Sequence, residues 1–235
     1  MNQLTLMLLL MVFPMMLGLW AQWRVKSAFS KGLKVPAACG LTGAEITGEI
    51  LRAHNISNVR ILEVPGTLSD HYDPKQRVLA LSSDVYHGRS VAALGVAAHE
   101  AGHAIQHATN YPLLALRNGV VPMAAVGNMG LWVTIIGMML GAGAGFGLGL
   151  WLAVIGLVMF SGVVIFQLVN LPVEFDASSR ARKLLQDTGL VTAGAEAGTM
   201  NRVLSAAAMT YVAATVAAVG TLLYYVLILF GNRNE

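Results

Sequence analysis

The stretch "NGVVPMAAVGNMGLWVTIIGMMLGAGAGFGLGLWLAVIGLVMFSGVVIFQLVNLPV", residues 118–173, contains no aspartate, glutamate, lysine or arginine. A helix needs roughly 20 apolar residues to cross the hydrocarbon core of a bilayer. The stretch is therefore long enough for two membrane-spanning helices. The glycine-rich segment "GAGAGFGLG", residues 141–149, is where we expect the chain to turn. The sequence thus predicts spans near residues 119–140 and 149–170.

Two further charge-free stretches, residues 1–23 and 203–232, lie on either side of this one. Each holds one more span, near 2–22 and 208–230. Only 11% of the chain is charged, whereas soluble domains carry about 25%. The alternative for the N-terminus, a cleavable signal peptide, requires a basic leading segment, and "MNQLTLMLLL" has none. The predicted fold class is mainly α, an integral membrane protein with four transmembrane helices.

The distribution of basic residues predicts the orientation in the membrane. Ten of the 15 lysines and arginines lie between the first and second predicted spans, four between the third and fourth, and one beyond the fourth. Cytoplasmic loops carry an excess of such residues. We therefore expect residues 24–118 and 171–207 to be cytoplasmic in a multi-pass protein of the inner or plasma membrane. No run of lysine and arginine indicates nucleic-acid binding.

The first of these segments, residues 24–118, has the pattern of a small α+β module. In "LTGAEITGEILRAHN", Thr42 can cap a helix while Glu45 reaches back to it, and this helix is expected to end near Asn55. The following "NVRILEVP", Asn58–Pro65, reads as a strand.

A turn-rich stretch, "TLSDHYDPKQ", separates that strand from a second strand candidate around Arg77–Leu81. Ser90 can then cap the helix "VAALGVAAHEAGHAIQHA". In the second segment, Pro172 is expected to mark a new helix start or a kink, and Gly189 a stop. A final helix is expected to run from there into the last span.

The sequence "HEAGH", His99–His103, matches the pattern H-E-x-x-H. On a helix, His99 and His103 lie about 40° and 6 Å apart, so both imidazoles can bind one ion. Glu100 flanks the same face, where it can serve as a general base toward water. Zinc suits such a site because it accepts neutral imidazole, and catalytic zinc sites use three protein ligands. The motif thus predicts a zinc site that needs a third ligand.

The third ligand must come from elsewhere on the cytoplasmic side, where Glu174, Asp176, Asp187 and Glu196 are candidates. The predicted hairpin returns the chain to the membrane face that it left, so Glu174 or Asp176 is best placed to complete the site. His107 lies a further 6 Å or so along the helix from the expected ion. We expect His107 to support the site or the fold rather than to bind the ion.

Three stretches resemble the YugP-type family of membrane zinc metallopeptidases and, more distantly, the HtpX-type integral-membrane zincins: "HYDPKQRVLALSSDVYHGRSVAALGVAAHEAGHAIQHA", "LPVEFDASSRARKLL" and "VLSAAAMTYVAATV". The resemblance covers about residues 65–220. It implies a zincin-like peptidase module of the gluzincin type. It also implies that His99, His103 and Glu174 bind zinc and that Glu100 is the catalytic base.

The chain departs from the HtpX-type pattern at one position. That pattern has an acidic residue four positions after the ligand glutamate, and here the position is Ser178. Asp176, two positions after the glutamate, is the expected substitute as a partner of a zinc-binding histidine.

A peptidase also needs a second donor to the oxyanion that forms during hydrolysis. The candidates are Tyr211, His71 and Arg180. Arg180 is also expected to contact the residues around the metal ligands without binding the ion itself. The strand around residues 78–81 is expected to bind substrate at a sheet edge, because edge pairing reads backbone rather than side chains.

The predicted function is a zinc-dependent endopeptidase that cleaves protein or peptide substrates at the cytoplasmic face of the bilayer, in quality control or processing of membrane proteins. One alternative is an intramembrane protease, but its "LDG"-type aspartate motif is absent. Another is a catalytically idle, zinc-bound scaffold or chaperone of membrane complexes. The intact Glu100 argues against the scaffold.

Overall fold

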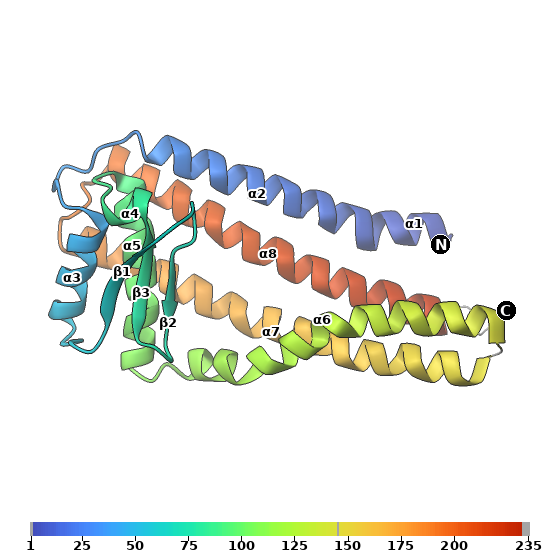
Figure 1. Cartoon of the computed structure of the whole chain (residues 1–235). Coiled ribbons are helices and arrows are strands. Elements are labelled where there is room, and N and C mark those ends of the chain that lie inside the picture. Colours follow the sequence, from blue (N-terminus) through green and yellow to red (C-terminus); the bar gives the residue numbers. More distant parts are fainter. Residues whose placement is uncertain (1, 145, 232–235) are drawn as a thin grey trace. The chain divides into compact units, whose positions relative to one another are not determined.

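The computed structural model describes residues 2–144 and 146–231 (Figure 1). Helices dominate, and three short strands lie in the first half of the chain. In chain order the elements are α1 (Gln3–Met7), the π-helical turn η1 (Leu8–Val12), α2 (Phe13–Gly32), α3 (Gly43–Ala53), β1 (Arg60–Val64), β2 (His71–Asp73), β3 (Val78–Ser82), α4 (Ser83–Tyr86), α5 (Val91–Ala108), α6 (Pro112–Ala144), α7 (Phe146–Asp187) and α8 (Ala195–Phe230).

Four helical segments in the described part of the chain are long and apolar enough to cross a membrane, as the sequence predicts. They are Gln3–Gly32, Pro112–Gly141, Gly147–Asp187 and Ala195–Phe230. Each extends beyond the apolar span that the sequence marks, because helical hydrogen bonding continues into polar residues. Large apolar side chains such as Trp132, Leu148 and Trp151 are exposed, by 68%, 80% and 69%. Such outward-facing side chains are what a lipid environment requires.

The chain turns within residues 141–149, as the sequence predicts: α6 extends to Ala144 and α7 begins at Phe146, and residue 145 lies outside the described part. One expectation about the third span is corrected. The new helix start at Pro172 is wrong, because α7 runs through this proline without interruption. Membrane helices tolerate proline where neighbouring groups compensate for the missing backbone donor.

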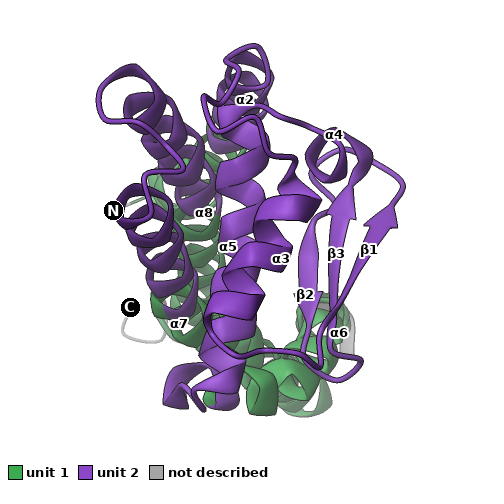
Figure 2. Cartoon of the chain, turned by 90° about the vertical axis from the view of Figure 1, so that its left-hand side faces the viewer, with its two compact units in different colours: residues 1–20, 116–172, 211–235 green, residues 21–115, 173–210 purple. Residues whose placement is uncertain are grey.

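The chain divides into two compact units (Figure 2). The first comprises residues 1–20, 116–172 and 211–235. In it, α6 packs against α7 through glycines: a Cβ added at Gly130 would lie 2.5 Å from the Gly156 oxygen, and one at Gly137 would lie 2.4 Å from the Ala153 nitrogen. The two backbones are therefore in direct contact, as small residues allow in membrane helices.

The second unit, residues 21–115 and 173–210, contains a three-stranded sheet with the order β1-β3-β2. The central strand β3 pairs parallel with β1 and antiparallel with β2. All five residues of β3 are buried. The expectation that residues 78–81 offer a free edge is therefore wrong, because both sides of this strand are already paired. The free edges belong to β1 and to β2, a strand that the turn-rich sequence around it did not predict.

Two helices of this unit begin as the sequence predicts. Thr42 Oγ1 accepts from the backbone nitrogen of Glu45 at 3.1 Å, and the Glu45 carboxylate accepts from the Thr42 nitrogen at 2.7 Å. Helix α3 ends at Ala53, and Asn55 follows in the left-handed region. Ser90 caps α5 by accepting from the Ala93 nitrogen at 3.1 Å.

Helix α5 forms the centre of the second unit, with the sheet on one side and α7 and α8 on the other (Figure 2). Fifteen of its 18 residues are buried. Small residues make this possible: a Cβ on Gly102 would lie 2.9 Å from the Ala177 oxygen of α7, and one on Gly95 would lie 3.5 Å from Met200 of α8. The helix that carries the H-E-x-x-H pattern is thus packed closely against the sheet on one side and against α7 and α8 on the other.

Candidate metal centre

Three buried side chains from two helices converge in the second unit. His99 and His103 lie one turn apart on α5, and Glu174 projects from α7. Their exposed fractions are 9%, 8% and 3%. Glu174 Oε2 lies 3.3 Å from His99 Nε2 and 3.5 Å from His103 Nε2. Of the four acidic residues left open by the sequence, Glu174 is the one that meets the histidines in the described residues.

The donor set of this cluster fits a zinc ion. Two imidazole nitrogens and one carboxylate oxygen lie within 4.8 Å of one another, and these are the atoms that bind zinc in proteins. Glu174 Oε2 is buried and has no hydrogen-bond partner among the residues that the structure describes. A buried carboxylate oxygen is costly unless a cation or a donor compensates it. The cluster therefore offers ligand atoms that suit a cation, and its buried carboxylate requires a cation or a donor to compensate it.

Gln106, whose role the sequence did not predict, holds the second histidine. Its Oε1 lies 2.9 Å from His103 Nδ1, and its Nε2 donates to the Val173 carbonyl at 2.9 Å and to Asp176 Oδ2 at 2.7 Å. Both amide hydrogens face groups that only accept, so the amide oxygen must face the ring. His103 Nδ1 therefore carries the hydrogen, and Nε2 keeps the lone pair that a metal needs. The signal for this role in the sequence was the position of Gln106, three residues after His103 on the same helix.

Among the described residues, Asp176 contacts the Gln106 amide rather than a histidine ring, so its expected part as a partner of a zinc-binding histidine runs through Gln106. Its Oδ2 also accepts from Arg180 Nε at 2.6 Å. The Arg180 guanidinium in turn lies 5.6 Å from the ring centre of Tyr111, within the range of a cation–π contact. Arg180, Asp176 and Gln106 thus form a connected chain of polar contacts that ends at His103.

Ser178 takes the place beside the first histidine. Its Oγ lies 3.2 Å from His99 Nδ1, and the serine is 2% exposed. This is the position where the HtpX-type pattern has an acidic residue. A hydroxyl can accept the ring N–H and orient the imidazole, but it adds no negative charge behind it. The two histidines are therefore held by different chemistry, a hydroxyl for His99 and an amide for His103.

Glu100 is buried next to the first histidine, with 7% of its surface exposed. Burial raises the pKa of its carboxyl above the usual range, while the imidazoles of His99 and His103 act in the opposite direction. It is not one of the three clustered ligand groups. A carboxylate with a raised pKa beside a candidate metal centre is a suitable general base.

Three other residues singled out by the sequence lie apart from the cluster or in the other unit. His107 Nδ1 is hydrogen bonded to the Tyr72 hydroxyl at 2.8 Å, so this histidine ties α5 to β2. His71 is exposed on β2, and its Nδ1 lies 2.9 Å from the Ser69 oxygen. Tyr211 belongs to the first unit. A role for His71 or Tyr211 in catalysis stays a prediction.

Comparison with known proteins supports a zinc ion at the cluster of His99, His103 and Glu174. Residues 7–230 match the family model described as "Putative neutral zinc metallopeptidase". The chain is also 43% identical over 231 residues to "Putative membrane protease YugP" of Bacillus subtilis (strain 168), covering 98% of this chain and 99% of that one. No solved structure matches the chain. The family match spans both units and all three clustered residues, and the chain therefore belongs to the neutral zinc metallopeptidase family that this model describes.

Proposed function

We propose that the protein is a zinc-dependent endopeptidase that cleaves protein segments at the cytoplasmic face of the membrane. The observation that carries the proposal is the meeting of His99, His103 and Glu174, with Glu100 buried beside them. This arrangement corresponds to the gluzincin type, in which two histidines of the motif and a distant glutamate bind the metal. The family and its printed relative support a protease.

The reaction assigns a separate task to each side chain. The chemistry that zinc supplies when bound is Lewis-acid polarisation of a water molecule and of the scissile carbonyl. Glu100 takes the proton of the attacking water on its carboxylate and delivers it to the leaving nitrogen. Ser178 and Gln106 hold the rings of His99 and His103 in the orientation that keeps Nε2 toward the centre.

Substrate is proposed to bind as an extended strand along β2. This strand is a free edge of the sheet, and the bond between Tyr72 and His107 fixes it to the helix of the metal centre. An extended segment would pair with the backbone of β2 and so be recognised largely independently of its side chains. Such loose selectivity suits the removal of unfolded or misassembled membrane proteins, which is the role we propose.

The structure favours this proposal over an intramembrane protease. Helix α5, which carries the motif, is not among the four helices of the described chain that could cross a membrane. It is instead packed between the sheet and other helices of the second unit, and 15 of its 18 residues are buried (Figure 2). This packing supports a peptidase module that lies outside the hydrocarbon core of the membrane.

The test that separates an enzyme from an idle scaffold is Glu100→Gln in the full-length protein. The change keeps the size of the side chain and removes the base, so proteolysis of an unfolded membrane substrate should fall by about 10²–10⁴-fold. Zinc content should stay at the wild-type level. Glu49→Gln, an exposed glutamate on α3, is the matched control and should cleave normally.

Two outcomes would contradict the proposal. Cleavage by Glu100→Gln at the wild-type rate would remove Glu100 from the mechanism. If the wild-type protein cleaves none of a panel of unfolded and membrane substrates, while both forms rescue a deletion strain equally, the scaffold is the correct function.

A further inference from the structure

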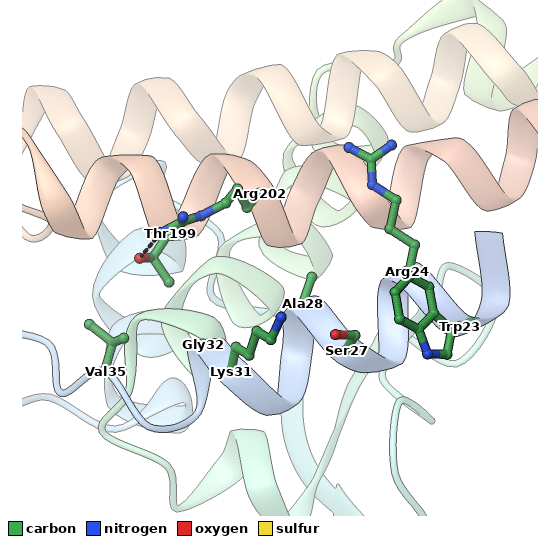
Figure 3. Close-up of a pocket in the computed structure, with 9 residues that line it drawn as sticks. All are labelled: Trp23, Arg24, Ser27, Ala28, Lys31, Gly32, Val35, Thr199 and Arg202. Atoms are coloured by element: carbon green, nitrogen blue, oxygen red, sulfur yellow. Dashed lines mark hydrogen bonds between the residues drawn. The ribbon is translucent and has the colours of Figure 1, made fainter. Parts of the chain in front are cut away.

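A basic cavity lies between α2 and α8 within the second unit (Figure 3). Its volume is about 360 Å³, within the range of roughly 300–1,000 Å³ of small-ligand pockets. Three cationic side chains, two hydroxyls and one indole are among the groups that line it: Arg24, Lys31, Arg202, Ser27, Thr199 and Trp23. None of the described residues that line it carries a carboxylate.

Both helices contribute groups to this lining. Arg24, Ser27 and Lys31 are spaced by three and four residues, so they share one face of α2. From α8, Arg202 donates to Thr199 Oγ1 at 3.0 Å, and the Thr199 hydroxyl donates to the Ala195 carbonyl at 2.8 Å. Thr199 is 7% exposed. This buried threonine therefore fixes the arginine along the wall of the cavity, as Figure 3 shows.

The charges of Lys31 and Arg202 have no carboxylate partner in the described residues. The acidic residue of α8 nearest to the cavity in the sequence is Glu196, one turn before Thr199. Its carboxylate accepts from the Ala38 nitrogen at 2.8 Å and from the Thr192 nitrogen at 2.7 Å. The Glu196 carboxylate is thus bonded to two loops rather than to the cations of the cavity. Positive charges that share one cavity favour a bound anion.

The sequence places this cavity at the level where two spans leave the bilayer. Arg24 is the first charged residue after the charge-free stretch 1–23, and Arg202 is the last one before the stretch 203–232. Trp23, which is 67% exposed, belongs to the residue type that gathers at membrane–water interfaces. Lipid phosphates lie at this same level.

We propose that the cavity binds the phosphate of an anionic phospholipid headgroup. Basic pockets between membrane helices are suited to such headgroups. The guanidinium of Arg202 matches phosphate oxygens in a two-pronged bond, Lys31 adds a point charge, and Ser27 offers a hydroxyl donor. A zwitterionic headgroup would bring its own cation among the three basic side chains, so phosphatidylglycerol binds more tightly than phosphatidylcholine. This proposal is independent of the proposed peptidase activity.

The test uses the full-length protein in micelles of an uncharged detergent. Short-chain phosphatidylglycerol, short-chain phosphatidylcholine and free glycerol 3-phosphate are titrated separately, and the bound fraction is read by native mass spectrometry. The variant is the double substitution Lys31→Gln/Arg202→Gln. The matched control is Lys26→Gln/Lys183→Gln, which removes the same charge from exposed lysines that do not line the cavity. Thermal denaturation of each variant checks that it is folded.

Each basic residue near a membrane surface contributes about a fivefold factor in affinity for anionic lipid, so the cavity variant should bind phosphatidylglycerol about thirtyfold more weakly. The control should change by less than about twofold, and phosphatidylcholine should bind weakly to all forms. Equal weakening by both double variants would mean diffuse attraction to a basic surface and would overturn the site. Equal binding of both lipids would overturn the selectivity for anions. Glycerol 3-phosphate binding as tightly as the lipid would overturn the lipid as the source of the phosphate.

Discussion

The substitution Gln106→Met tests whether the second histidine is oriented by a neutral amide. Methionine has a similar length and stays buried, but it removes the acceptor of His103 Nδ1 and one partner each from Val173 and Asp176. Loss of such a supporting partner typically weakens metal binding by about 10–100-fold, which equals about 1.4–2.7 kcal/mol. The unpaired ring N–H adds a cost of about 1–3 kcal/mol to the folded state.

Both effects can be measured on the purified full-length protein. Zinc affinity is read by competition with a chelating dye, and stability by thermal denaturation with and without added zinc. Gln186→Met, at an exposed position of α7, is the control and should leave both values near wild type. A folded Gln106→Met protein that binds zinc as tightly as wild type would show that this amide does not orient His103, and the tautomer deduced from it would lose its basis.

Three further predictions concern the metal, the packing and the membrane topology. Glu174→Ala should lose most of the bound zinc, measured as metal per chain, whereas His107→Ala should keep it because that histidine is bonded to β2; equal retention in both would exclude the glutamate as a ligand. Gly102→Ala should lower the free energy of unfolding by about 1–3 kcal/mol, because its Cβ would lie 2.9 Å from a backbone oxygen of α7; an unchanged denaturation midpoint would show that the two helices can separate freely. In a background without the native cysteine, a cysteine at Arg60 should resist an impermeant reagent in intact cells and one at Ala144 should react; the reverse pattern would invert the orientation.

Local signals in the sequence predicted the elements that depend on local chemistry. The reciprocal bonds of Thr42 and Glu45 and the cap at Ser90 formed as expected, because they involve residues three positions apart. Strand β2 was missed because it has only three residues, and its pairing depends on β3 rather than on its own composition. The unbroken apolar run Val78–Leu81 is typical of a strand that is buried on both faces, and all five residues of β3 are buried; the pairing of both its edges depends on β1 and β2 and could not be read from this run.

At the candidate metal centre, spacing along one helix predicted the relation of His99 to His103. The return of the chain through the predicted hairpin narrowed the third group to two acidic residues, and the resemblance pointed to Glu174. The partners behind the rings could not be predicted in the same way. Whether an amide, a hydroxyl or a carboxylate contacts an imidazole depends on how α5 and α7 are rotated about their axes, and two residues along a helix move a side chain by about 200°. Asp176 therefore bonds to Gln106 while Ser178 contacts His99.

The glycine contacts between α6 and α7 also determine which sequence changes this protein can accept over generations. Apolar side chains that face outward, such as Trp132 and Leu148, can be exchanged for others of similar character at little cost. The glycines of the contact cannot be exchanged in this way, because even a methyl group at Gly130, Gly137 or Gly156 would lie within 3 Å of the opposite backbone. A one-residue insertion near the middle of α6 would turn every later position by about 100° and move the remaining glycines off the contact. Descendant chains should therefore vary widely in the residues of this hairpin but hardly at all in the number of residues between Gly130 and Gly137 of α6.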